Sequence, residues 1–123
     1  MQACRGLRGA TTVQENDAEK MLNATTELLQ SLIEANGLRE EDIASVTFSA
    51  TPDLDAVCPA AAARQLGWTR TALLCVQEMA VPGSLPRCIR VLIHWNTERS
   101  IDELCHIYLR QARALRPDWA KSQ

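Results

Sequence analysis

The chain has 123 residues, of which 46% are hydrophobic, so it can bury one substantial core but is short for two domains. Its formal net charge of -2 argues against nucleic-acid binding, because a phosphate-binding surface needs clustered basic side chains, which would make the net charge of the chain positive. No stretch approaches the ~18 apolar residues of a membrane span. We therefore expect a single domain over residues 1–123, with neither nucleic acid nor membrane as a partner.

The first half of the chain predicts a strand, a long helix and a second strand. The strand covers Gln2–Ala10, and we expect it to turn at Gly9 because glycine punctuates the segment. Asn16 or Asp17 then caps a helix in which leucines recur at helical spacing until Gly37 ends it. Residues 43–50 alternate apolar and polar side chains, which is typical of a half-buried strand.

The second half predicts one short helix and three further strands. Pro59 stands at the first position of an alanine-rich helix. Strands are expected over 72–76, 89–95 and 107–109, with a turn of helix over 101–105. The order predicts an α+β fold, in which a mixed five-stranded sheet carries one long and one short helix.

The cysteines predict the redox environment. Their number is odd and their spacing contains neither CxxC nor a Cys/His pattern, so we expect neither a disulfide framework nor a zinc site. The N-terminus also lacks the apolar core of a secretory signal. These observations predict a reducing compartment and a cytoplasmic protein.

Arginine makes up eleven of the thirteen cationic side chains, and several arginines stand near the ends of predicted strands. Arg8, Arg90 and Arg116 are the clearest cases. Because a guanidinium grips a carboxylate with two parallel hydrogen bonds, this distribution indicates a site for a small dicarboxylate. Glu78, directly after the strand at 72–76, is either an exposed loop carboxylate or an acceptor for a ligand hydroxyl.

The residues give little support to conventional catalytic chemistry. The sequence has no glycine-rich phosphate loop, Ser/His/Asp set, metal-ligand cluster or nucleotide fingerprint, so no cofactor and no metal are expected. His94 and Cys75 lie within apolar strands and are interpreted as structural side chains. An enzyme built from these residues would have to accelerate its reaction by positioning and charge.

Six segments together resemble a known family. They are Arg5–Thr12, Ser49–Leu54, Gln77–Met79, Cys88–Arg90, Tyr108–Leu109 and Leu115–Asp118. In this order they resemble the monofunctional chorismate mutases of the trimeric pseudo-α/β-barrel class. The resemblance implies a cofactor-free rearrangement of chorismate to prephenate, in the biosynthesis of phenylalanine and tyrosine. It also implies a homotrimer with its sites between neighbouring subunits.

The resemblance assigns roles to individual residues. Arg90 corresponds to the catalytic cation beside the breaking ether bond, and Glu78, the second catalytic residue, holds the ring hydroxyl together with Cys75. Arg8 corresponds to the arginine that binds a substrate carboxylate, with Tyr108 beside it. These positions form the centre of the expected site.

Further positions complete the expected substrate-binding set. Arg64 would come from the neighbouring subunit, whereas Leu115 and Arg116 would close over the pocket. Cys58 stands where the family commonly has phenylalanine, and Ala60 lies beside it. We expect the tail from about residue 113 to be mobile until ligand binds.

Two other functions are compatible with the same arginines. One is a non-catalytic trimeric binding protein that holds a carboxylate metabolite. The other is a hydrolase or deaminase of small imines or amides, which is disfavoured because the sequence shows no paired base. Turnover of chorismate distinguishes the enzyme from the binding protein.

Overall fold

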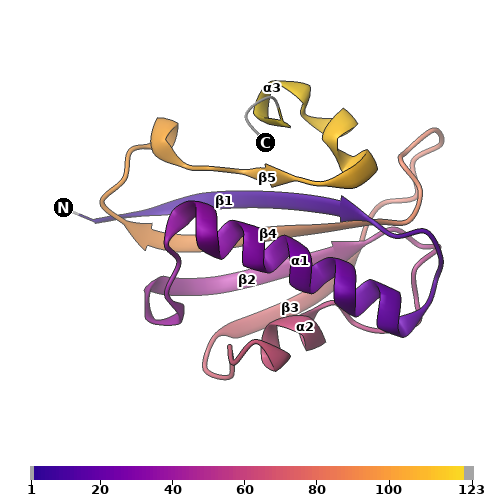
Figure 1. The fold of residues 1–123 in the computed structure, drawn as a ribbon, viewed down its shortest axis with the longest axis horizontal. Coiled ribbons are helices and arrows are strands. Elements are labelled where there is room, and N and C mark those ends of the chain that lie inside the picture. The colour runs from indigo at the N-terminus through magenta and orange to yellow at the C-terminus, as the bar shows by residue number, and fades with distance from the viewer. Residues whose placement is uncertain (1, 121–123) are drawn as a thin grey trace.

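The computed structural model describes residues 2–120 (Figure 1). Its strands and helices are β1 (Ala3–Thr12), α1 (Ala18–Asn36), β2 (Ile43–Ala50), α2 (Ala60–Gln65), β3 (Ala72–Gln77), β4 (Cys88–Thr97), β5 (Ile107–Tyr108) and α3 (Pro117–Ala120). Short 3₁₀ turns over Glu40–Asp42, Ile101–Glu103 and Arg110–Leu115 connect them. None of the helices described is long and apolar enough to cross a membrane.

The five strands form one mixed sheet in the order β3-β2-β4-β1-β5. β4 is antiparallel to both β1 and β2, whereas the outer pairs β2–β3 and β1–β5 are parallel. Both α1 and α2 lie on the same face of this sheet (Figure 1). The predicted α+β fold with one long and one short helix is confirmed, and the short helix α3 is an addition that the sequence did not indicate.

The boundary predicted for the first strand is wrong. β1 runs through Gly9 to Thr12, so Arg8 lies in the middle of the strand and not at its end. Gly9 is required for a different reason: a Cβ atom there would lie 3.0 Å from Leu32 and 3.1 Å from Leu28 of α1. The glycine therefore marks the close approach of helix to sheet.

The hydrophobic core fills the space between the helices and the sheet. α1 is capped by Asp17, whose carboxylate accepts a hydrogen bond from the Lys20 amide, and it ends at Gly37 in the left-handed conformation. Its buried side chains meet alternate residues of the strands. The central members of this cluster are Leu7, Leu28, Leu29, Leu32, Val46, Phe48, Val91 and Ile93. Burial of alternate strand residues leaves their sequence neighbours on the other face.

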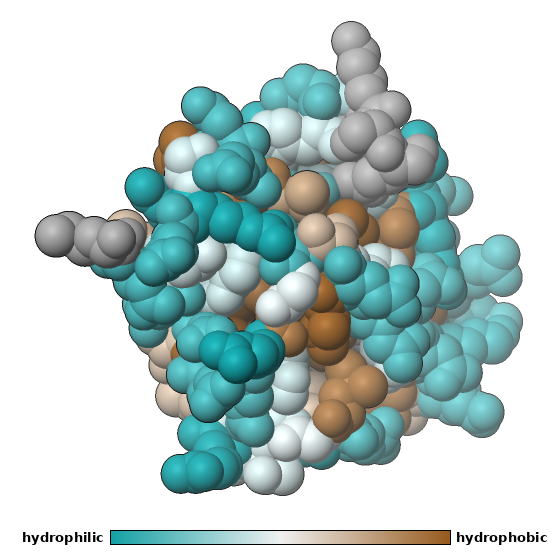
Figure 2. Space-filling model, turned by 60° about the vertical axis from the view of Figure 1, so that its left-hand side comes forward, coloured by the Kyte–Doolittle hydropathy of each residue, from teal (hydrophilic) through white to brown (hydrophobic). Residues whose placement is uncertain are grey.

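The other face of the sheet has no α1 or α2 above it. Leu74 and Val76 of β3 are exposed there, and the segment from β5 to α3 lies along β1 (Figure 1). On the side of the molecule drawn in Figure 2, hydrophobic side chains gather centrally between hydrophilic ones. Of the tail predicted to be mobile, residues 113–115 belong to the last 3₁₀ turn and residues 117–120 to α3, whereas residues 121–123 lie outside the described residues.

Candidate active site

Three of the predicted site residues line one cavity on the open face of the sheet. Arg8 comes from β1, Arg90 from β4, and Glu78 directly follows β3. The cavity has a volume of about 350 Å³ and is also lined by Thr47, Ser49, Val76, Val91 and Leu92. The strand register explains the convergence, because Arg8 pairs with Leu92 while Ala10 pairs with Arg90, which puts both arginines on the same face.

Arg90 and Glu78 form the polar centre of this cavity. Nε of Arg90 lies 3.6 Å from Oε1 of Glu78, and that oxygen accepts a hydrogen bond of 2.6 Å from the Ser49 hydroxyl. Ser49 is the direct register partner of Arg90 across β2 and β4. Nε of Arg90 is buried and has no hydrogen-bond partner within residues 2–120. The guanidinium is thus a cation in a fixed position, and its Nε–H is available to donate a hydrogen bond to a ligand.

Tyr108 brings a phenol close to the same arginines. The residue is 1% exposed on β5, where it pairs with Ala10 of β1. Burial raises the pKa of the Tyr108 hydroxyl, and the positive charges of Arg8, Arg116 and Arg90 partly oppose that rise. The hydroxyl is therefore protonated at neutral pH and can donate a hydrogen bond.

Arg8 also lines a neighbouring cavity of about 670 Å³, together with His106, Asp118 and Trp119. Arg116 does not line this second cavity but holds two residues that do. Its guanidinium binds both carboxylate oxygens of Asp118 and lies 3.4 Å from the centroid of the Trp119 ring. The ion pair holds the pKa of Asp118 below its usual range and raises that of Arg116.

Besides Cys75, which is described below, four predicted site residues lie away from the cavity. Leu115 is partly buried against the cluster that contains Tyr108. Arg64 is exposed on α2, while Ala60 of the same helix is 3% exposed and belongs to the main core. Cys58 precedes α2 and does not line the cavity within this chain. The structure of one chain therefore does not bring these residues to Arg8 and Arg90.

Cys75 and Cys58 are joined by a disulfide with a Cα–Cα distance of 6.5 Å. The cysteine spacing indicated no disulfide framework, and this single bond was not predicted from it. Cys75 alternates along β3 with Leu74 and Val76, so its side chain points to the helix-covered face, where the segment before α2 passes. This proximity depends on how α2 packs on β3, which cysteine spacing does not reveal.

Asn36, a buried amide in the last turn of α1, was not among the predicted site residues. Its Nδ2 donates to the carbonyl oxygens of Leu32 and Cys105, and its Oδ1 accepts from the Cys105 amide at 2.9 Å. These bonds fix the segment that leads into His106 and Tyr108. A polar residue on the buried face of a helix was the only available signal.

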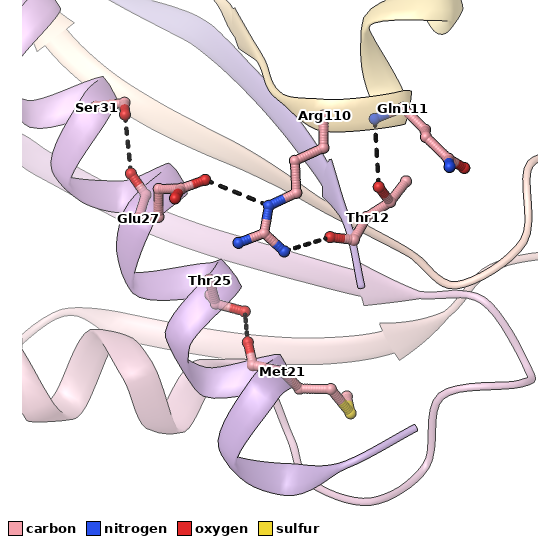
Figure 3. Close-up of polar contacts among 7 residues, drawn as sticks. All are labelled: Thr12, Met21, Thr25, Glu27, Ser31, Arg110 and Gln111. Carbon is pink, nitrogen blue, oxygen red and sulfur yellow. Dashed lines mark hydrogen bonds and ion pairs between the residues drawn. The ribbon is translucent and has the colours of Figure 1, made fainter. Parts of the chain in front are cut away.

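Arg110 anchors the chain directly after β5 (Figure 3). Its Nη1 donates to the Thr12 carbonyl at 3.0 Å, and its Nε lies 3.5 Å from Glu27 of α1. The adjacent Gln111 amide donates to the Thr12 hydroxyl. A cavity of about 570 Å³ beside these residues contains none of the predicted site residues, so it is separate from the site described above.

Comparisons with known proteins agree over nearly the whole chain. The model of the family "Chorismate mutase type I" matches residues 4–119. The chain is 51% identical over 120 residues to chorismate mutase AroH of Thermus thermophilus, and this alignment covers 97% of this chain and 98% of that protein. It is 46% identical over 115 residues to chorismate mutase AroH of Bacillus subtilis (strain 168), where the alignment covers 93% of this chain and 91% of that protein.

A solved structure gives the same result. The chorismate mutase from Clostridium thermocellum aligns with a TM-score of 0.88 and 49% sequence identity, over 89% of this chain and 98% of that chain. The fold and these matches define an isomerase, and they give no support to the alternative of a non-catalytic binding protein. The chain belongs to the chorismate mutase type I family.

Proposed function

We propose that the protein converts chorismate to prephenate, with Arg90 as the catalytic cation and Glu78 as its partner in the site. The observation that carries this assignment is the convergence of Arg8, Glu78 and Arg90 on one cavity. The rearrangement is intramolecular: a carbon–oxygen bond breaks as a carbon–carbon bond forms, so no electron, group or proton has to be supplied. Such a reaction needs conformational restraint and charge stabilisation, and this site offers both.

Arg90 would stabilise the negative charge that grows on the ether oxygen. A fixed cation binds this developing charge more strongly in the transition state than in the ground state, and therefore raises the rate. Its position between β1 and β2 and the ion pair with Glu78 restrict its movement. Glu78 retains acceptor capacity for the ring hydroxyl of the substrate. The Cys75 side chain points to the opposite face of the sheet and is bonded to Cys58, so it does not reach that hydroxyl in this cavity.

Arg8 and Tyr108 would bind the carboxylates of the substrate. None of the hydrogen bonds or ion pairs found within residues 2–120 uses the Arg8 guanidinium, so its donors are available to an anion. Holding the substrate at two carboxylates selects the compact conformer that the rearrangement requires. Leu115 and Arg116 would close the pocket from the segment that packs beside Tyr108.

We further propose that three copies of the chain complete the sites. The open face of the sheet exposes Leu74 and Val76, and the loop after β3 exposes Met79; burial of such side chains favours association. In a trimer, Arg64, Cys58 and Ala60 of one subunit would border the cavity of its neighbour. Each chain would supply one chorismate mutase domain over residues 1–123, acting in the cytoplasm.

The direct test is to mix the purified protein with chorismate and follow its ultraviolet absorbance without added metal or cofactor. Consumption of chorismate with formation of prephenate is expected. A flat trace at micromolar protein would overturn the assignment. Light scattering of the same sample tests the trimer independently of activity.

Arg90→Lys tests the assigned role of the cation. A lysine ammonium is a mobile point charge, so we expect kcat to fall about 100-fold or more with a much smaller change in KM. Arg70→Lys is the matched control, because within residues 2–120 only the backbone amide of Arg70 takes part in a hydrogen bond. Equal losses in kcat and in substrate affinity would contradict a role confined to the transition state.

A further inference from the structure

We propose that Cys58 and Cys75 form a reversible thiol–disulfide modification site that sets the affinity of the active site for its substrate. The proposal rests on the function proposed above, since it concerns the regulation of that same site. The bond is observed between two residues 17 positions apart, whereas Cys4, Cys88 and Cys105 are free. It joins the segment before α2 to the edge strand β3.

A small dithiol can reach the bond, because Cys58 is exposed in the single chain and, in the proposed trimer, borders a cavity that the substrate must also enter. Cys58 is exposed and Cys75 is partly buried on β3, which pairs only with β2. Cys88, by contrast, is fully buried, and burial raises the pKa of its thiol. A thiolate can attack a disulfide only where it has access to a sulfur atom, so the exposed Cys58 is the expected point of attack.

The cross-link supplies a connection to the sheet for a helix, α2, that has few contacts of its own. This helix has only six residues, and its first turn receives no side-chain cap. The side chains that it buries in the core are the methyl groups of Ala60, Ala62 and Ala63. A helix this short is not stable by itself, so its position depends on the few contacts at its ends. Cys58 immediately precedes Pro59 and thus ties the start of α2 to the sheet.

The two elements that the bond joins serve different parts of the proposed site. β3 places Val76 in the cavity and leads directly into Glu78, whereas α2 carries Arg64, which is proposed to reach the neighbouring subunit. The disulfide therefore fixes the position of one subunit's α2 relative to its own cavity. Breaking it would loosen Arg64 while leaving Arg90 and Glu78 in place, because β4 holds Arg90 and the Glu78 amide donates to the Ala50 carbonyl.

The reaction is an exchange with a dithiol. The dithiol supplies two electrons and two protons, the Cys58–Cys75 bond becomes two thiols, and the dithiol closes to its own disulfide. We expect the oxidised enzyme to bind substrate more tightly. Reduction should raise KM about five-fold or more, within the range of ordinary coupling between sites, and should leave kcat nearly unchanged.

The experiment measures kcat and KM for chorismate on the full-length protein after treatment with dithiothreitol or with its oxidised form. Alkylation followed by mass spectrometry counts the thiols in each sample. A rise in KM upon reduction supports the proposal. Equal KM values in two samples whose thiol counts differ would overturn it, as would a bond that dithiothreitol does not reduce in the folded protein. Absence of turnover in both states would overturn the proposed function and, with it, this inference.

Two variants separate the specific bond from general effects of dithiothreitol. The double variant Cys4→Ser, Cys105→Ser removes two exposed free thiols and should retain the full response. Cys58→Ser should lose the response and show the higher KM of the reduced enzyme under both conditions. A Cys58→Ser variant that still responds to dithiothreitol would exclude the proposed site.

Discussion

The two faces of the sheet show how one set of strands separates stability from chemistry. On the face covered by α1 and α2, β2 and β4 present Phe48 and Val91, which are buried in the main core. On the open face, the next residues along the same strands are Ser49 and Arg90, which line the cavity. Because strand side chains alternate, adjacent residues can meet opposite requirements without any change of backbone.

The energetics of the faces differ accordingly. Burial of apolar side chains on the covered face contributes about 1.5–3 kcal/mol for each large residue. The Arg90–Glu78 pair on the open face leaves about 30% of both side chains exposed, and ion pairs this accessible add about 1 kcal/mol at most. The pair is therefore better explained by the placement of charge than by the stability of the fold.

The largest expected difference comes from adjacent residues of β2. Phe48→Ala removes a fully buried ring from the covered face and should lower the free energy of unfolding by about 3–5 kcal/mol. Thr47→Ala, one residue away on the open face, should change it by about 0.5 kcal/mol or less. Urea unfolding at one fixed protein concentration measures both. Similar losses for the two variants would contradict the assignment of the faces.

Asn36→Ala tests the link between the covered face and the segment leading to Tyr108. The change leaves the amide and the carbonyl of Cys105 without their partner, so we expect a loss of about 3 kcal/mol in unfolding free energy. Ser31→Ala, at a partly exposed position of the same helix, is the control, since among the described residues its hydroxyl bonds only to the Glu27 carbonyl (Figure 3). A loss in both variants would point to helix propensity instead.

Gly9→Ala tests the close approach of α1 to β1. The new methyl group would crowd Leu28, Leu32 and the Ile107 carbonyl oxygen at 3.0–3.2 Å, which should destabilise the protein by about 1–2 kcal/mol. Gly6→Ala in the same strand meets only Leu92 at 3.5 Å, an ordinary contact, and should be tolerated. Thermal unfolding of the pair gives the comparison, and equal melting temperatures would refute the packing argument.

Much of the fold could be predicted because its signals are local. The alternation over 43–50 and the leucines between Asp17 and Gly37 identified β2 and α1 correctly. The predicted end of the first strand at Gly9 was wrong, since the sequence alone does not distinguish a glycine that ends a strand from one that allows a helix to pack closely on it. Only the packing of α1 distinguishes them.

The cavity could be predicted in part. Arg8, Glu78 and Arg90 were identified from residue type and resemblance, and their convergence follows from strand register. The Cys58–Cys75 bond could not be predicted, because it depends on the way that α2 packs on β3. The role of Asn36 was equally hidden, since its partner Cys105 lies 69 residues away.

His106 provides the smallest expected effect, a dependence of stability on pH. Its Nδ1 accepts the Arg8 amide at 3.0 Å, and its ring stacks on Trp119. Burial lowers the pKa of His106 below its ordinary value of 6.5, and the charges of Arg8 and Arg116 lower it further. As pH falls from 6.5 towards this lower pKa, the unfolded chain takes up a proton that the folded chain does not, so stability decreases across that window.

His106→Asn retains an acceptor for the Arg8 amide but does not titrate. We therefore expect the melting temperature of the unmodified protein to fall more between pH 7.5 and about 5.5 than that of the variant, because only the former loses the contribution of a neutral imidazole. The two proteins share every other ionisable group, so the comparison isolates the effect of His106. Parallel curves would show that His106 is protonated alike in the folded and unfolded chains, which would remove the link between the open face and pH.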